Sequence, residues 1–228
     1  MNNKEIGGFF GLEKLINNCG EFYPDLIHLN TGRNCLLLIV KNKKIGKIYI
    51  PLFLCDSIVN LCRKYNIGYE EYNVGKDLMP IFNKSLKSDE FILIVNYFGF
   101  LNKNKIVELK NKYKNIIIDN TQAFFSKPVE GVDTFYSCRK YFGVPDGAYL
   151  YMPESSQIEL KQDDSYSRMT HIEGRSTYCA SDFYFKYREN EALLRTLPLL
   201  KMSCLTQELL VSFDYASIKN QRENNYSG

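Results

Sequence analysis

The chain has 228 residues, of which 45% are hydrophobic and 24% are charged, so it is long enough to bury a substantial single core. Its 29 basic and 26 acidic residues give a net charge of +3, and lysines are spread along the whole chain, so composition does not predict nucleic-acid binding. The longest apolar runs are far shorter than the roughly 20 residues of a membrane span, and the first residues lack a signal-peptide pattern. We therefore expect a cytoplasmic protein without a membrane partner.

Cysteine and histidine usage supports this expectation. The seven cysteines are odd in number and include no Cys-x-x-Cys pair, which favours reduced thiols over a disulfide framework. Only His28 and His171 are present, so we expect structural or surface histidines and no histidine-based metal site.

The pattern of apolar runs predicts an α/β fold. Strand-like runs occur at 47–51, 91–95, 115–119, 133–137 and 147–151, and helix-like stretches occur at 33–43, 55–66 and 102–114. This alternation predicts a three-layer fold with a mostly parallel sheet covered by helices. Further on, we expect an exposed loop at Lys161–Arg175 and a helix at Ser181–Leu197 that ends at Pro198. The simplest division is a main domain at 1–155, followed by a loop and helical extension at 156–228.

Asp119 is the first candidate site residue. It follows the buried strand-like run at 115–118, so it would lie at the carboxyl end of a strand, where open α/β sheets place their ligands. A carboxylate there would favour a protonated pyridine ring by a gross Coulomb energy of roughly 4 kcal/mol at an effective dielectric near 20. Gln122 has the reach and the amide to bind a ring substituent beside it. The more common role of an aspartate after a strand is in a turn or a helix cap.

Lys140 is the second candidate. An amine reacts with an aldehyde only when unprotonated, so its pKa must be lowered by burial or by a nearby cation, and Lys140 is flanked by Arg139 and several aromatic residues. Ser137 precedes it by three positions. Taken alone, Lys140 would more often be a solvated surface group, and Ser137 would bind only a backbone group. The order and spacing of the three residues together favour a cofactor site.

Three stretches resemble one known family. Ile-Ile-Ile-Asp-Asn-Thr-Gln-Ala at 116–123, Thr-Phe-Tyr-Ser-Cys-Arg-Lys at 134–140 and Gly-Ala-Tyr-Leu-Tyr at 147–151 are similar to the large domain of the DegT/DnrJ/StrS sugar aminotransferases. These are pyridoxal-phosphate enzymes of fold type I. The resemblance implies that Asp119 pairs with the pyridinium nitrogen, that Gln122 lies by the ring hydroxyl, that Ser137 holds the phosphate, and that Lys140 forms the covalent link. Family members usually have two more residues between this serine and this lysine.

Further residues extend the resemblance. The loop around Gly32 and Arg33 precedes an apolar helix-like run, and helix N-termini bind phosphate readily. The family uses such a loop to hold the cofactor phosphate, with a hydroxyl residue where this chain has Arg33. In the family, a residue shortly after the proline that corresponds to Pro51 stacks on the cofactor ring, and either Phe53 or Cys55 would occupy that place. Phe53 is the better candidate, because its flat aromatic face suits a flat ring. Packing in the core is about as common a role for such a phenylalanine.

The end of the strand at 91–95 contributes to the same expected site. Asn96 and Tyr97 follow this run directly, at the place where the family often has a polar or aromatic residue near cofactor or substrate. Asn96 is therefore a further candidate cofactor contact.

Three functions remain open at this point. The resemblance implies a pyridoxal-phosphate aminotransferase that takes an amino group from glutamate and transfers it to a keto-sugar nucleotide, in amino-sugar or surface-polysaccharide biosynthesis. It also implies a homodimer and a smaller C-terminal domain, which this chain is too short to contain. The second reading is a truncated or non-catalytic relative that keeps the fold. A different nucleotide-binding α/β enzyme ranks lowest because the chain has no Gly-x-Gly-x-x-Gly or Walker loop. Lysine at position 140 argues against the family's dehydratases, which have histidine there.

Overall fold

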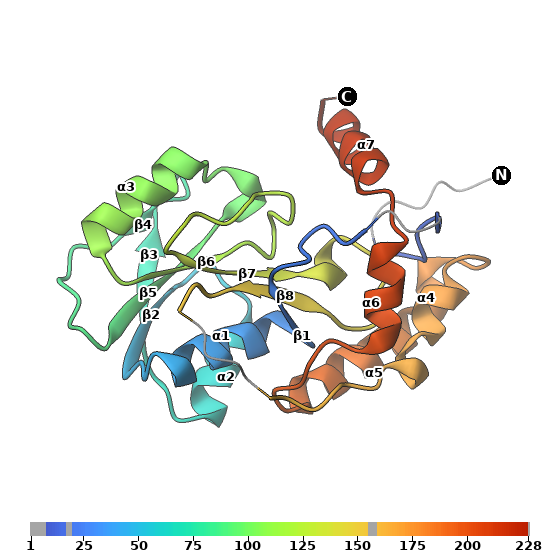
Figure 1. The fold of residues 1–228 in the computed structure, drawn as a ribbon, viewed down its shortest axis with the longest axis horizontal. Helices are drawn as coiled ribbons and strands as arrows, with labels where there is room; N and C mark the ends of the chain where they lie inside the picture. The colour runs from blue at the N-terminus through green and yellow to red at the C-terminus, as the bar shows by residue number, and fades with distance from the viewer. Residues whose placement is uncertain (1–7, 17–19, 155–158, 228) are drawn as a thin grey trace.

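A computed structural model describes residues 8–16, 20–154 and 159–227, and it shows an eight-stranded sheet with the order β1-β8-β7-β6-β5-β2-β3-β4 (Figure 1). The strands are β1 (Ile27–Leu29), β2 (Lys47–Pro51), β3 (Gly68–Val74), β4 (Pro80–Ile81), β5 (Glu90–Val95), β6 (Ile116–Asp119), β7 (Asp133–Ser137) and β8 (Ala148–Tyr151). Neighbours from β3 through β7 are parallel, whereas β8 is antiparallel to both β7 and β1, and β4 is antiparallel to β3. The predicted mostly parallel sheet is confirmed.

Helices cover both faces of this sheet. The α-helices are α1 (Gly32–Asn42), α2 (Asp56–Lys64), α3 (Lys103–Tyr113), α4 (Thr170–Gly174), α5 (Ala180–Thr196), α6 (Cys204–Val211) and α7 (Tyr215–Ser227). Three short 3-10 turns are η1 (Tyr97–Gly99), η2 (Cys138–Lys140) and η3 (Tyr166–Arg168). Helices α1 and α2 lie on one side of the sheet and α3 lies on the other, so the predicted three-layer arrangement is confirmed (Figure 1).

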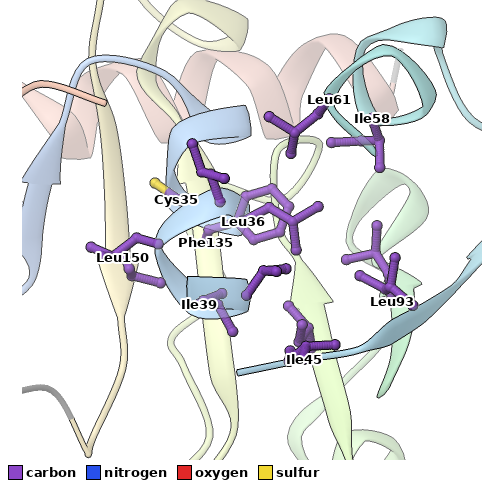
Figure 2. Packing of buried hydrophobic residues seen from close by; sticks show 14 of the residues in the cluster. Cys35, Leu36, Ile39, Ile45, Ile58, Leu61, Leu93, Phe135 and Leu150 are labelled. Carbon is purple, nitrogen blue, oxygen red and sulfur yellow. The ribbon is translucent and has the colours of Figure 1, made fainter. Parts of the chain in front are cut away.

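Helix α1 forms the centre of the first layer. Thr31 caps it, with its Oγ1 accepting a hydrogen bond from the N–H of Asn34 at 3.3 Å. Leu36 and Ile39 of α1 are fully buried, and Figure 2 shows them in one cluster with Phe135 and Leu150 of the sheet. Each such side chain stabilises the fold by roughly 1.5–3 kcal/mol through burial.

Burial on both faces explains the continuous apolar strands. Leu93 of β5 packs with the α1 layer, whereas its neighbours Ile92 and Ile94 pack with the α3 layer. Successive side chains of a strand point to opposite faces, so a strand covered on both sides needs apolar residues at every position.

The C-terminal helices pack on the sheet as well. Leu210 of α6 and Phe213, which follows this helix, are fully buried in an aromatic cluster with Tyr136 of β7 and Tyr149 of β8. The predicted helix at 181–197 is confirmed as α5, with Leu197 as its C-cap. The proposed domain boundary at 155/156 falls within 155–158, which lies outside the described residues.

The expectation of an exposed loop at Lys161–Arg175 is wrong. This segment contains η3 and α4, and the side chains of Asp163 and Arg168 are buried against each other as an ion pair at 2.9 Å. Pairing allows both charges to leave water, so a segment without an apolar period can still be part of the interior. No helix in the described ranges is both long enough and apolar enough to cross a membrane.

Candidate functional site

Asp119 lies at the carboxyl edge of the sheet, as predicted. It ends β6 between Val95 of β5 and Phe135 of β7, and only 3% of it is exposed. Its Oδ1 accepts a hydrogen bond from the N–H of Thr121 at 2.8 Å, and no basic side chain among the described residues forms a salt bridge with it. Burial raises the pKa of Asp119 to about 6, opposed by the hydrogen bonds of Thr121 and the charge of Lys140. Asp119 is therefore a buried carboxylate that a cationic ligand would stabilise.

Lys140 lies within electrostatic range of this carboxylate. It is the last residue of η2, which directly follows β7, and its side chain is exposed. The aromatic residues beside it in the sequence do not enclose it, since Phe135 and Phe142 are buried in the core. Arg139 forms an ion pair with Glu191 of α5 instead of remaining free beside the lysine amine. The charge of Lys140 thus reaches Asp119 and lowers its pKa slightly, while the lysine itself lies open to solvent.

Tyr97 lies near the carboxylate, and Phe53 stacks on Tyr97. The hydroxyl of Tyr97 donates to the carbonyl of Phe53 at 2.6 Å, and the two rings stack with centroids 5.3 Å apart. Burial and the nearby charge of Asp119 raise the pKa of Tyr97 to about 12, which places Tyr97 close to Asp119. Phe53 is 62% exposed, so it offers a ring face to a ligand at this edge. Cys55 is also exposed, and its Sγ lies 2.8 Å from Oγ of Ser57.

The N-terminus of α1 approaches the same edge. A Cβ placed on Gly32 would lie 3.5 Å from Cγ2 of Thr121, the residue that binds Asp119. The first N–H groups of a helix have no partner within it; Thr31 accepts those of Asn34 and Cys35, which leaves the N–H groups of Gly32 and Arg33 for an anion here. Arg33 is half-buried and lines a separate cavity between α1, α2 and the end of α5. Gly32 is therefore the residue of the α1 terminus that lies nearest to the Asp119 edge, whereas the Arg33 side chain lies in the other cavity.

The remaining predicted residues differ in how freely their side chains could contact a cofactor. Ser137 ends β7, is half-buried, and its side chain does not cap η2. Gln122 is exposed, and its backbone carbonyl accepts a hydrogen bond from Tyr141 at 2.6 Å.

Asn96 is the least available of the predicted contacts. It is fully buried, and its amide bonds with Asn120 at 3.0 Å and with the N–H of Leu101 at 2.8 Å. These bonds give Asn96 a structural role in the turn after β5, and its contact with a cofactor stays a prediction.

Two nearby residues were missed by reasoning from the sequence. Thr121 supplies the N–H that binds Asp119, and an Asp-x-Thr turn after a strand is a signal that could have identified it. Asp146, in the turn after Lys140, is fully buried and accepts bonds from the N–H and the hydroxyl of Ser203 at 2.8 and 2.6 Å. It fastens the N-terminus of α6 to this turn.

These groups match the needs of one kind of cofactor. A buried carboxylate without a basic partner suits a protonated ring nitrogen, a helix N-terminus suits a phosphate, and an exposed aromatic ring suits a flat heterocycle. A nearby lysine suits an aldehyde. Pyridoxal phosphate carries all four features, so the donor set of this site fits it. No group of three or more potential metal ligands occurs among the described residues.

Comparison with known proteins gives matches at the level of solved structures only. No protein-family model and no curated protein matches the sequence. DesV from S. venezuelae is 15% identical, with a TM-score of 0.46 over 77% of this chain and 54% of that chain. A putative aminotransferase from Burkholderia pseudomallei is 14% identical, with a TM-score of 0.44 over 75% of this chain and 55% of that one. L-threonine-O-3-phosphate decarboxylase from Porphyromonas gingivalis is 16% identical, with a TM-score of 0.45 over 56% and 44%. This chain therefore spans about half the length of the structures that it resembles.

Proposed function

We propose that the chain binds pyridoxal phosphate at the carboxyl edge of its sheet and acts as an aminotransferase. The observation that carries the proposal is a buried, uncompensated Asp119 carboxylate that feels the charge of Lys140. Asp119 is buried, forms no salt bridge with a basic side chain of the described residues, and lies within electrostatic range of an exposed lysine. A buried carboxylate is costly unless a ligand or partner compensates it. A cationic heterocycle that also reacts with an amine would account for both residues.

Each residue then has a defined task. Asp119 holds the proton on the ring nitrogen, and Phe53 covers one face of the ring. Gly32 and the N-terminus of α1 hold the phosphate with Ser137, while Gln122 and Asn96 bind at the rim of the ring. Arg33 instead lines the separate cavity beside α2 and α5. The Lys140 amine anchors the cofactor and moves a proton between the reacting carbon and solvent. When bound, pyridoxal phosphate supplies an electron sink for the transfer of an amino group.

The substrate class is proposed from the sequence motifs. The stretches around Asp119, Lys140 and Gly147 resemble sugar aminotransferases, so we propose a keto-sugar nucleotide as amino acceptor and glutamate as amino donor, within the cytoplasm. The test is a two-step assay on the full chain loaded with cofactor. Glutamate should change the visible spectrum and release 2-oxoglutarate, and a keto-sugar nucleotide should restore the first spectrum. No spectral change with any amino acid would contradict the proposal.

A non-catalytic relative that retains cofactor binding is the second candidate. It is favoured by the exposure of Lys140, because an exposed lysine is the usual state of a surface residue that has no catalytic role. The same assay separates the two candidates: a protein that takes up the cofactor but never releases 2-oxoglutarate would be the non-catalytic form.

We also propose a homodimer. Helix α5 exposes Tyr184, Phe185 and Leu193 with 50%, 57% and 45% of their surface accessible, which is more apolar area than a helix facing only water usually carries. Sedimentation velocity should give a dimer, and Phe185→Glu should shift it to a monomer. A wild-type protein that sediments as a monomer at all concentrations would contradict this assignment.

A further inference from the structure

A basic cavity lies outside the proposed cofactor site. It has a volume of about 140 Å³ and lies between the N-terminus of α1, the length of α2 and the C-terminus of α5. Three basic side chains line it, those of Arg33, Lys64 and Arg195, and none of its lining residues is acidic. The charged groups that line this cavity therefore have one sign.

The two arginines have no counter-ion in the described part of the chain. Arg33 is half-buried, and neither Arg33 nor Arg195 has a salt bridge or a side-chain hydrogen bond with any described residue. Burial lowers the pKa of Arg33, and the charge of Arg195 lowers it further, which places the two guanidinium groups near each other. Like charges in such proximity repel each other unless an anion lies between them.

Lys64 provides the third cation from α2. Its Nζ donates to the carbonyl of Thr196 at 3.3 Å, which draws the amine towards the end of α5 and leaves two further N–H groups for a ligand. Ser57 and Asn60 of α2, and Tyr65, which follows it as its C-cap, add neutral hydrogen-bonding groups. Arginine forks, a lysine and hydroxyl groups are the side chains that proteins use to bind phosphate.

The cavity is held in shape by bonds between its walls. Nδ2 of Asn34 donates to the carbonyl of Pro198 at 2.7 Å and to Oδ1 of Asn30 at 2.7 Å, which fixes the chain after α5 against the start of α1. Buried Leu61 and Leu194 form the apolar part of the wall. A preformed site binds its ligand without first having to order its own walls.

We propose that this cavity binds a phosphate group, through Arg33, Lys64 and Arg195, at a place separate from the cofactor. The two sites lie on different sides of the α1 terminus, because Gly32 faces Thr121 and the Asp119 edge, whereas Arg33 faces α2 and α5. The phosphate belongs either to a nucleotide or to free inorganic phosphate, and both present the same charged oxygens. The proposal does not depend on aminotransferase activity.

Isothermal titration of the full chain with inorganic phosphate, and separately with a nucleoside diphosphate, tests the proposal. Arg195→Gln should weaken binding at least about tenfold, the usual loss for one charge-assisted hydrogen bond. Lys64→Gln should also weaken it. Arg63→Gln is the matched control, since Arg63 is an exposed arginine on α2 that does not line the cavity, and it should bind as the wild type does. Tighter binding of the nucleotide would assign the site to a nucleotide phosphate, and equal binding would assign it to free phosphate.

Two further measurements distinguish loss of phosphate binding from unfolding and from loss of the cofactor site. In buffer without phosphate, Arg195→Gln should melt no lower than the wild type, because it relieves repulsion of Arg33 and breaks no bond. The variant should also take up pyridoxal phosphate normally, which separates this site from the cofactor site. Absence of phosphate binding, or equal binding by the wild type, Arg195→Gln and Lys64→Gln, would overturn the proposal.

Discussion

Replacement of Asp119 by asparagine should stabilise the cofactor-free protein while weakening cofactor binding. The folded state raises the pKa of Asp119 from 3.8 to about 6, mainly through burial. This difference of about two pH units corresponds to about 3 kcal/mol of unfavourable free energy when the carboxylate is charged. Asp119→Asn removes the charge and retains an oxygen that accepts the Thr121 N–H bond, so most of this cost should be recovered.

The dependence on pH follows from the direction of the pKa change. Below pH 3.8 the carboxyl is protonated in both states, so it costs nothing. Between pH 3.8 and about 6 the unfolded chain releases its proton first, so the wild type loses stability relative to the variant. Above that range the difference in free energy of unfolding between the wild type and the variant is constant and at its maximum.

Urea unfolding of both proteins from pH 4 to pH 8 measures this profile. The free energies of unfolding of the variant and the wild type should be nearly equal near pH 4. At pH 7 to 8 that of the variant should be higher by up to about 3 kcal/mol. Asp25→Asn is the control for an exposed carboxylate, and at pH 8 its free energy of unfolding should stay within about 0.5 kcal/mol of the wild type. Added pyridoxal phosphate should stabilise the wild type more than the variant. An Asp119→Asn protein that is less stable than the wild type at pH 8 would refute the reasoning, since Asp119 would then hold the fold and not a ligand.

Three further substitutions test the packing around the site, each by urea unfolding. Leu36→Ala should lower the free energy of unfolding by about 2–5 kcal/mol, because Leu36 is fully buried between α1 and the sheet. A smaller loss than that caused by Leu52→Ala, at an exposed leucine, would contradict this packing. Asp146→Ala should cost about 3 kcal/mol by leaving the buried N–H of Ser203 without its acceptor, and Asp146→Asn should be less damaging. Phe98→Gly should be less destabilising than Phe100→Gly by about 1 kcal/mol, because Phe98 has a left-handed φ of 53° and Phe100 does not, and equal losses would count against strain at Phe98.

The sheet could be predicted where a strand is buried on both faces. The strands β5 and β6 are apolar without interruption at 91–95 and 116–118, and this composition is typical of central parallel strands. Strand β3, Gly68–Val74, was not predicted, because it contains two glutamates and an asparagine and has exposed positions along one side. Strand β1 has only three residues and depends on pairing with β8, a contact across more than a hundred residues that no local pattern reveals.

The candidate site divides in the same way. Asp119 could be placed from the sequence because it ends a recognisable strand, and its neighbours in the sheet follow from the parallel order. The surroundings of Lys140 could not, because the direction in which a residue points after a strand depends on tertiary packing: Phe135 and Phe142 turn into the core and Lys140 does not. The cavity between α1, α2 and α5 is lined by residues between 33 and 197, so no local sequence pattern could predict it.

The covalent attachment of pyridoxal phosphate tests the central claim most directly. The full chain is incubated with the cofactor, reduced with borohydride, digested and analysed by mass spectrometry, beside Lys140→Ala and the control Lys76→Ala, which replaces an exposed lysine of another loop. The predicted result is a visible absorption band and a modified peptide that contains Lys140, both lost in Lys140→Ala and retained in Lys76→Ala. An equal yield of adduct in Lys140→Ala, attached to other lysines, would contradict the assignment of Lys140 and of the site around Asp119.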